Sequence, residues 1–140
     1  MKKAIVLDAN ILIRAVLGVK MMGLLESHHE SVQFFTPSSC FEDAANYLPH
    51  LLEKRGIPGD CVMDVLESLK CLVIPIDDAL LVADQARAKQ RLVSRDEQDW
   101  AILATAMAFD CPIWTEDKDF FGCGVAVWNT QNIRYFLHHD

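Results

Sequence analysis

Five short apolar segments, spread along 140 residues and separated by stretches with helical spacing, constrain the fold of this chain more than any other feature. Apolar runs of this length are typical of strands that are buried on both faces of a parallel sheet. They occupy residues 3–7, 32–36, 71–75, 112–115 and 125–128. The stretches that we expect to be helical are 10–27, 37–55, 60–69, 77–90, 95–109 and 130–138. Strands alternating with helices indicate parallel βαβ units. The pattern therefore predicts an α/β fold of three α/β/α layers, with a central parallel sheet of about five short strands.

Glycine, proline and aspartate residues mark where several of these helices should begin or end. Gly18 is a possible break in the first helical stretch. Pro49 predicts a kink or break in the helix that begins near residue 37, and Gly56 is expected to end that helix. Asp77 or Asp78 could cap the helix that reaches residue 90.

The length and composition are those of a folded single domain, which we expect to span residues 1–140. Apolar residues make up 51% of the chain, so there is enough apolar surface to bury and disorder is not expected. Five cysteines without a CxxC pair predict reduced, buried thiols in a cytoplasmic protein. No apolar stretch approaches 18 residues without a charge, and Asp8 and Arg14 interrupt the N-terminal apolar run. We therefore expect neither a membrane span nor a signal peptide.

The net charge of −7 argues at first against a nucleic-acid partner, because binding to phosphates usually needs a basic surface. The objection weakens if several carboxylates hold divalent cations, which invert the local charge. Some basic residues could also form a local rim, although a solvated helix surface is the simpler interpretation of each. These residues are Lys54, Arg55, Arg87, Lys89, Arg91 and Arg95.

Acidic residues follow two of the predicted strands at their carboxyl ends, where open parallel sheets place their binding sites. Asp8 comes directly after the first strand, and Asn10 could approach the same site, although either could instead cap a helix. Asp117 and Asp119 come just after the fourth strand. The sequence therefore predicts a cluster of polar oxygen atoms at one edge of the sheet.

Two further acids lie on predicted helices. Glu42 is a site candidate, but it could equally be the fourth residue of a capping box that begins at Ser39. Its neighbour Asp43 points about 100° away around the helix, so the two cannot share one role. Asp99 is expected to lie inside a helix, on the same apolar face as Ile102. A carboxylate on such a face is costly unless it is paired or bound to a metal. An aspartate at the edge of that face, reaching solvent, is the alternative.

The segment before Asp99 offers local structural roles for its own polar residues. Ser94 and Glu97 form another possible capping box, and Asp96 suits the first turn of a helix. The histidine pairs 28–29 and 138–139 lie near segment ends, where solvated side chains are more typical than metal ligands.

Carboxylates gathered at one edge would repel one another by roughly 4 kcal/mol per pair at about 4 Å and an effective dielectric constant of about 20. A bound cation removes that repulsion, and ligands that are all oxygen atoms suit Mg²⁺ or Mn²⁺. The hypothesis that follows is a site for a divalent cation at this edge of the sheet. The sequence has no glycine-rich phosphate loop and no Ser/His/Asp or nucleophilic cysteine arrangement that would indicate another chemistry.

Three segments together resemble the PIN domain, and the resemblance covers nearly the whole chain. They are AIVLDANILIRAVL at 4–17, TPSSCFEDAANYL at 36–48 and DWAILATAMAFDCPIWTEDKDF at 99–120. The resemblance implies a metal-dependent nuclease similar to the toxin ribonuclease of type II (VapC-like) toxin–antitoxin pairs. The residues that it implies as catalytic and metal-binding acids are Asp8, Glu42, Asp99 and Asp117. It also implies Asp119 as a further metal ligand, with Asn10 and Asp96 as accessory residues.

We therefore expect a Mg²⁺- or Mn²⁺-dependent endoribonuclease with RNA as its substrate. A small antitoxin partner and a homodimer are expectations from the same resemblance. One alternative is a catalytically inactive PIN-like domain that serves as an interaction module. A second is a phosphatase similar to the haloacid dehalogenases, but the second aspartate of that pattern is replaced here by Asn10.

Overall fold

The computed structural model describes residues 2–93 and 95–138, and its centre is a five-stranded sheet. The strand order is β3-β2-β1-β4-β5, and each neighbouring pair is parallel. The strands are β1 (Lys3–Leu7), β2 (Val32–Pro37), β3 (Val73–Ile76), β4 (Ile113–Trp114) and β5 (Val127–Trp128). Lys3 of β1 pairs with Val32 of β2, and Val6 pairs with Ile113 of β4. The predicted α/β fold with a parallel sheet is confirmed.

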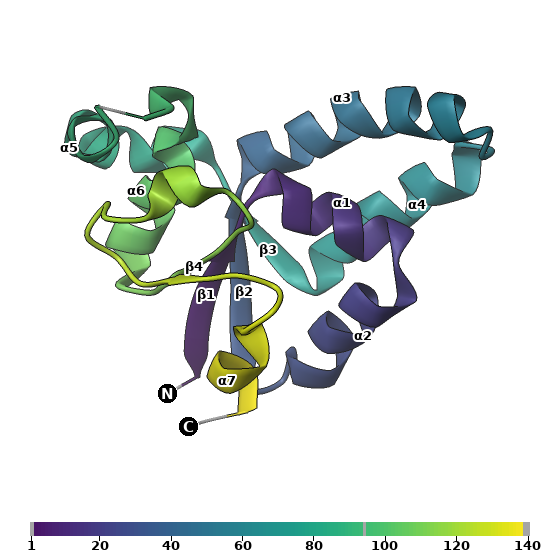
Figure 1. The fold of residues 1–140 in the computed structure, drawn as a ribbon, viewed down its shortest axis with the longest axis horizontal. Helices are drawn as coiled ribbons and strands as arrows, with labels where there is room; N and C mark the ends of the chain where they lie inside the picture. The colour runs from purple at the N-terminus through teal and green to yellow at the C-terminus, as the bar shows by residue number, and fades with distance from the viewer. Residues whose placement is uncertain (1, 94, 139–140) are drawn as a thin grey trace.

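Helices cover both faces of the sheet and complete three layers (Figure 1). The α-helices among the described residues are α1 (Ala9–Leu17), α2 (Val19–His28), α3 (Ser38–Arg55), α4 (Asp60–Ser68), α5 (Gln85–Arg91), α6 (Trp100–Phe109) and α7 (Ile133–His138). The 3₁₀ turns are η1 (Leu69–Cys71), η2 (Asp78–Asp84), η3 (Glu97–Asp99) and η4 (Lys118–Phe120). In Figure 1, α1 to α4 lie on one side of the strands, and α5 and α6 lie on the other.

Most of the predicted helix boundaries agree with the structure. The break at Gly18 separates α1 from α2, and Gly56 ends α3 with a positive φ of 67°. The predicted break at Pro49 is wrong, because α3 continues through this exposed residue. An exposed face lets water satisfy the carbonyl group that proline leaves without its helical donor.

The two helices predicted after the third strand are each divided into a 3₁₀ turn and an α-helix. Residues 78–84 form η2 before α5, and residues 97–99 form η3 before α6. Asp77 accepts a hydrogen bond from the backbone N–H of Ala79 at 3.0 Å, so one of the two predicted caps is confirmed.

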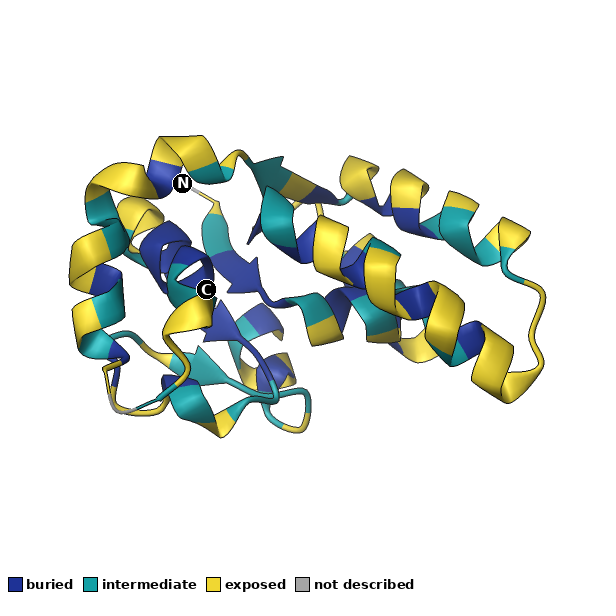
Figure 2. Cartoon of the chain, turned by 90° about the horizontal axis from the view of Figure 1, so that it is seen from above, coloured by how far each residue is buried: buried dark blue, intermediate teal, exposed yellow. Residues whose placement is uncertain are grey.

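The core surrounds the central strand β1, whose last three residues are fully buried. The Trp114 ring of β4 is also fully buried and lies 6.5 Å from the Phe34 ring of β2, centroid to centroid. Figure 2 shows this buried interior beneath helices whose outer faces are exposed. Close packing of this kind fixes the backbone from which the loops at the strand ends emerge.

All five cysteines are free, but only Cys40, Cys111 and Cys123 are buried. The prediction of buried thiols is therefore wrong for Cys61 and Cys71, which are exposed at the ends of α4 and η1. Within residues 2–93 and 95–138, no helix combines the length and the apolar character needed to cross a membrane.

The order of the strands makes the chain leave β1 toward one side of the sheet and return to the other side of β1 later. The chain passes from β1 to β2 on one side, continues to β3, and then returns to place β4 on the other side of β1. Loops that leave neighbouring strands in opposite directions open a crevice between them. The loops after β1 and β4 contain Asp8 and Asp117 respectively.

Candidate active site

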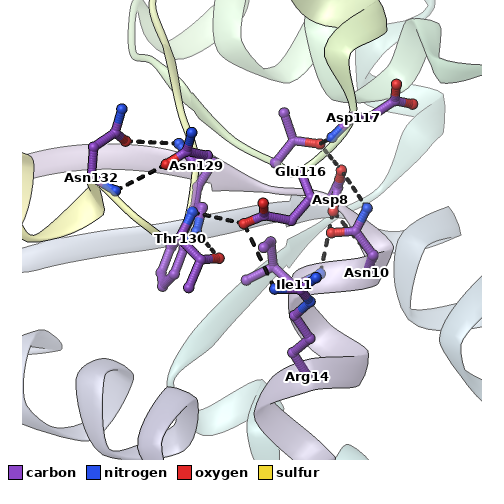
Figure 3. Close-up of polar contacts among 11 residues, drawn as sticks. Asp8, Asn10, Ile11, Arg14, Glu116, Asp117, Asn129, Thr130 and Asn132 are labelled. Atoms are coloured by element: carbon purple, nitrogen blue, oxygen red, sulfur yellow. Dashed lines mark hydrogen bonds and ion pairs between the residues drawn. The ribbon is translucent and has the colours of Figure 1, made fainter.

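Asp8 is the most deeply placed acid, with only 4% of its surface exposed. It is the N-cap of α1, and its Oδ1 atom accepts hydrogen bonds from the backbone N–H groups of Asn10 at 3.1 Å and Ile11 at 3.3 Å. Its Oδ2 atom accepts a further hydrogen bond from the Asn10 side-chain amide at 3.2 Å. Figure 3 shows these contacts at the start of α1. Asp8 therefore caps the helix and also borders the crevice, so the two roles proposed from the sequence coexist.

Thr115 joins Asp8 to the loop that follows β4. Its buried hydroxyl group donates a hydrogen bond to Oδ2 of Asp8. The hydroxyl oxygen of Thr115 also accepts a hydrogen bond from the backbone N–H of Asp117 at 2.9 Å. The sequence analysis did not include Thr115 among the site residues. A polar residue at the end of a buried strand, two positions before an acid, was the signal that could have identified it.

The structure places Asp117 and Asp119 in one turn, but only Asp117 lines the cleft. The Asp117 carboxylate accepts a hydrogen bond from the backbone N–H of Asp119 at 2.9 Å and so caps η4. Asp119 is half-buried and lies within electrostatic range of Asp99. Its position is therefore peripheral to the other acids.

Asp99 lies at the junction of η3 and α6, where it is the residue before the first turn of α6. The prediction that it lies inside a helix is wrong, because the 3₁₀ turn ends at this residue. Its side chain is half-buried and makes no capping hydrogen bond to α6. Asp96 is exposed and caps the same turn by accepting a hydrogen bond from the Gln98 backbone N–H at 2.9 Å. The capping box predicted from Ser94 lies outside the described residues.

The structure brings Asp43, and not Glu42, to the cleft. Helix α3 begins at Ser38, and its first turn is held by Asp78, which accepts hydrogen bonds from the Ser38 hydroxyl group and the Ser39 backbone N–H. The predicted capping box at Ser39 is therefore wrong. Glu42 borders a separate, smaller depression of about 300 Å³ on another face of α3.

A single cleft of about 1000 Å³ connects the carboxylates of Asp8, Asp43, Asp99 and Asp117. Its walls are α1 and α3, which pack against each other. Asn10 also lines the cleft, as expected for an accessory residue. The segments that supply the acids lie far apart in sequence, and the fold gathers them at the carboxyl edge of β1 and β4.

The carboxylates in this cleft disfavour one another's ionised forms. Burial is the main cause that raises the pKa of Asp8 from 3.8 to about 6, and the charge of Asp117 adds to it, against the lowering effect of the hydrogen bonds. Burial also raises the pKa of Asp99 to about 7, with further contributions from Asp96, Asp117 and Asp8. A raised pKa means that the metal-free cleft holds negative charge at an energetic cost.

Cys40 also lines the cleft, but it serves there as a buried apolar residue and not as a reactive thiol. Its side chain is buried, and burial raises the pKa of its thiol well above the usual range. The thiolate is the nucleophilic form of cysteine, so a thiol that stays protonated does not attack a substrate. Cys40 therefore contributes no nucleophile to the cleft.

Arg14 supplies positive charge beside the acids. One of its guanidinium nitrogens lies 3.8 Å from Oε1 of Glu116, and that oxygen also accepts a hydrogen bond from the Thr130 backbone N–H at 2.7 Å (Figure 3). Arg14 lines the cleft from α1, whereas Glu116 lies in the loop after β4. The long, half-exposed ion pair holds Arg14 only weakly.

The donor atoms of the cleft fit a hard divalent cation in their chemistry. They are carboxylate oxygens, which Mg²⁺ and Mn²⁺ prefer. In the arrangement seen for residues 2–93 and 95–138, no three His, Cys, Asp or Glu side chains are grouped closely enough to hold a metal ion. A cation of this kind can be held by one or two carboxylates together with water molecules.

His28, His29 and His138 are not part of the lining of this cleft. The His28 ring contacts the Leu24 carbonyl oxygen through Nδ1 at 2.9 Å and packs edge-on against the His138 ring at 5.0 Å between centroids. His29 contacts the Glu26 carbonyl oxygen at 2.8 Å, and His139 lies outside the described residues. The contacts with the carbonyl oxygens are local to α2, and the contact between the two rings joins α2 to α7.

Comparisons with known proteins identify both a family and a fold. The family described as "PIN domain" matches residues 6–138. PAE2754 from Pyrobaculum aerophilum is similar in structure, with a TM-score of 0.76 and 13% sequence identity over 99% of this chain and 98% of that one. No curated protein matches the sequence.

Two other solved structures share the fold. VapBC2 from Rickettsia felis, bound to a DNA fragment from the promoter, contains a chain with a TM-score of 0.68 and 16% identity over 90% of this chain and 98% of that one. FitAcB from Neisseria gonorrhoeae contains a chain with a TM-score of 0.56 and 22% identity over 91% of this chain and 99% of that one. At these identities the likeness concerns the arrangement of helices and strands.

Proposed function

The chain belongs to the PIN domain family, and on that premise we propose that it is a Mg²⁺- or Mn²⁺-dependent endoribonuclease. The observation that carries the proposal is the gathering of Asp8, Asp99 and Asp117 at the carboxyl edge of the sheet, where burial first, and then neighbouring acidic charges, raise the pKa of Asp8 and Asp99. A folded protein tolerates such repulsion when a ligand compensates it, and a cation is the simplest ligand of that kind.

The residues proposed to hold the cation are Asp8, Asp43, Asp99 and Asp117, because all four carboxylates line the same cleft. Asp43 takes the place that the sequence analysis gave to Glu42. Asp119 is kept as an accessory candidate because its charge contributes to the raised pKa of Asp99. Asp96 is the outermost of the acids and is already engaged in capping η3.

When bound, a divalent cation would supply Lewis acidity toward the phosphoryl oxygens and increase the acidity of water at the site. The protein's own part is to hold the carboxylates. Thr115 and the start of α1 restrain Asp8 with hydrogen bonds from several directions. The same Thr115 hydroxyl group also fixes the backbone of Asp117, so the two acids are positioned together. Asn10 adds an amide beside Asp8.

We also propose that the protein is the toxin of a toxin–antitoxin pair and binds a small antitoxin. The resemblance of its three sequence segments to toxin ribonucleases supports this proposal, as does its similarity in fold to chains of VapBC2 and FitAB. Co-expression with the product of a short neighbouring reading frame should yield a stable complex that no longer cleaves RNA. A soluble active nuclease that copurifies with no such product would contradict the toxin assignment.

The enzymatic proposal is tested by incubating a labelled, mostly single-stranded RNA pool with the protein and Mn²⁺. We expect cleavage that EDTA abolishes and that Asp99→Asn also abolishes, because both remove the means of holding a cation. Cleavage that survives both treatments would contradict the proposal.

Failure of wild type and variant alike to cleave, together with a melting temperature that millimolar Mn²⁺ leaves unchanged, would favour the inactive interaction module. A functional site should be stabilised by its cation by RT ln(1 + [L]/Kd), which is about 2.7 kcal/mol when the cation concentration is 100 times the Kd.

A further inference from the structure

Helix α3 presents one continuous face to the cleft, and this face extends well beyond the acidic residues. At about 100° per residue, its first four members lie within about 100° of one another around the helix, and the fifth, in the last turn, lines the same cleft. They form what we call the α3 stripe: Asp43, Asn46, Tyr47, His50 and Arg55. The acid lies at the end near Asp8, and the arginine lies at the far end of the helix.

We propose that the α3 stripe binds a segment of single-stranded RNA next to the bond that is cleaved. The inference rests on the proposed nuclease function and adds to it where the substrate strand runs. The chemistry of the stripe changes along its length, from a carboxylate at the acidic end to amide, aromatic, imidazole and guanidinium groups. Only the acidic end is explained by the binding of a cation.

Tyr47 provides the group that favours a single strand over a duplex. Its side chain is 53% exposed although it lines a cleft, so its ring face is available to a ligand. Nucleic-acid bases stack on such rings only when they are not already stacked in a helix. Asn46 lies one position away on the same face and offers an amide to base edges or sugar hydroxyl groups.

Arg55 and Arg14 provide positive charge on the two walls of the cleft. Arg55 belongs to the last turn of α3, and Arg14 to the last turn of α1. The ion pair of Arg14 with Glu116 is long and half-exposed, so a phosphate could replace it at little cost. In a chain with a net charge of −7, these local cations are the means by which an anionic strand can approach the acids.

The length of the stripe suits a short segment. Asp43 and Arg55 are twelve positions apart on one helix, which corresponds to about 18 Å at 1.5 Å per residue. A stacked strand advances about 3.4 Å per nucleotide, so roughly five nucleotides could follow the stripe. The stripe therefore predicts that nucleotides on one side of the cleavage point contribute to binding.

Lys54 offers a matched control, because it carries the same charge as its neighbour Arg55 and is exposed on the same helix, but lies outside the cleft lining. The effect of removing a charge from α3 can thus be separated from the effect of removing it from the stripe. Tyr47→Phe is a second control, since it keeps the ring and removes only the hydroxyl group.

The test is fluorescence anisotropy with labelled single-stranded RNA of about ten nucleotides, long enough to span the segment of roughly five. Asp99→Asn protein is used, in which cleavage is expected to stop and acidic repulsion is reduced. We expect Tyr47→Ala to weaken binding about tenfold or more, and Tyr47→Phe to bind nearly as tightly as the Asp99→Asn parent. Arg55→Ala should lower the slope of log K against log salt concentration by about 0.7, the value for one phosphate contact on a single strand. Lys54→Ala should leave that slope unchanged.

Equal binding by Tyr47→Ala and the parent, or equal slopes for Arg55→Ala and Lys54→Ala, would overturn the proposal. Absence of RNA binding by the Asp99→Asn parent would also overturn the proposal and would favour a protein as the ligand of the α3 stripe. Because binding is measured without cleavage, the two proposals can fail separately. RNA binding through the stripe by a wild-type protein that cleaves nothing would contradict only the nuclease. RNA cleavage without a contribution from Tyr47 and Arg55 would contradict only the stripe.

Discussion

The side-chain hydroxyl group of Thr115 donates a hydrogen bond to the carboxylate of Asp8, and so joins the end of β4 to the start of α1. The hydroxyl oxygen of Thr115 also accepts a hydrogen bond from the backbone N–H of Asp117 at 2.9 Å. One buried hydroxyl group therefore fixes two of the acids at the carboxyl edge of the sheet. Its position suggests a direct test of whether the geometry of the acids matters.

Replacing Thr115 with valine keeps the shape of the side chain but removes both hydrogen bonds. We expect the free energy of unfolding to fall by about 1–3 kcal/mol, because buried polar groups are left without partners. RNA cleavage should fall by roughly tenfold or more, in the range seen when partners of metal ligands are lost. Thr115→Ser retains the hydroxyl group and should recover most of both losses. Chemical unfolding and cleavage assays measure the two effects, and a fully active Thr115→Val protein would contradict the positioning role.

Asp43 and Glu42 provide a second test, because they are adjacent on α3 but only Asp43 lines the acidic cleft. We expect Asp43→Asn to reduce Mn²⁺-dependent cleavage by roughly tenfold or more, whereas Glu42→Gln should change it by less than about twofold. Each substitution removes one charge while nearly preserving shape, so each serves as the control for the other. The opposite ranking would restore Glu42 as the site residue that the sequence analysis predicted.

The pH dependence of stability follows from the raised pKa values of Asp8 and Asp99, at about 6 and about 7. For a carboxyl group whose pKa is raised by folding, the folded state binds the proton more tightly than the unfolded state. The stabilisation is complete below about pH 4 and is lost as the pH rises through the folded pKa. We therefore expect the melting temperature in EDTA to decrease between about pH 4 and pH 7. A constant or increasing melting temperature in the wild type would contradict the raised pKa values.

Asp99→Asn should separate stability from function. The substitution removes a half-buried charge that burial and four neighbouring acids disfavour. We expect this variant to melt a few degrees higher than the wild type at pH 8 in EDTA, at about 3 °C per kcal/mol, and to show a weaker decrease with pH. Addition of Mn²⁺ should stabilise the wild type and leave the variant nearly unchanged. Equal stabilisation of both proteins would exclude Asp99 from the site.

The fold was largely predictable from the sequence because buried parallel strands are short, continuous apolar runs that can be recognised in the sequence itself. The positions of Asp8 and Asp117 followed from the same pattern, since Asp8 comes directly after β1 and Asp117 lies three residues after the end of β4. The details of the helix starts were less accessible. Glu42 was named as a site acid because of the resemblance to the PIN domain, and a capping box was its structural alternative. In the structure the start of α3 is held instead by Asp78, 40 positions away from Ser38.

Asp99 shows the same limitation. Its neighbours have helical spacing, but a 3₁₀ turn ends at this residue and leaves it at the beginning of α6. A change from 3₁₀ to α geometry shifts each backbone hydrogen-bond partner by only one residue. The spacing of apolar residues is therefore nearly the same in both, and the sequence does not distinguish them. Arg14 and Tyr47 were not connected with the site from the sequence, because their relevance depends on the packing of α1 against α3.

The most direct test of the central claim is the binding of Mn²⁺ to the purified protein, measured by calorimetry in parallel with cleavage of labelled RNA. The account predicts that wild-type protein binds Mn²⁺ and cleaves RNA, that Asp8→Asn and Asp99→Asn lose both properties, and that Glu42→Gln retains both. Unchanged Mn²⁺ binding in Asp8→Asn and Asp99→Asn, or cleavage by wild-type protein from which all divalent cations have been removed, would contradict the claim that these acids form a metal-dependent nuclease site.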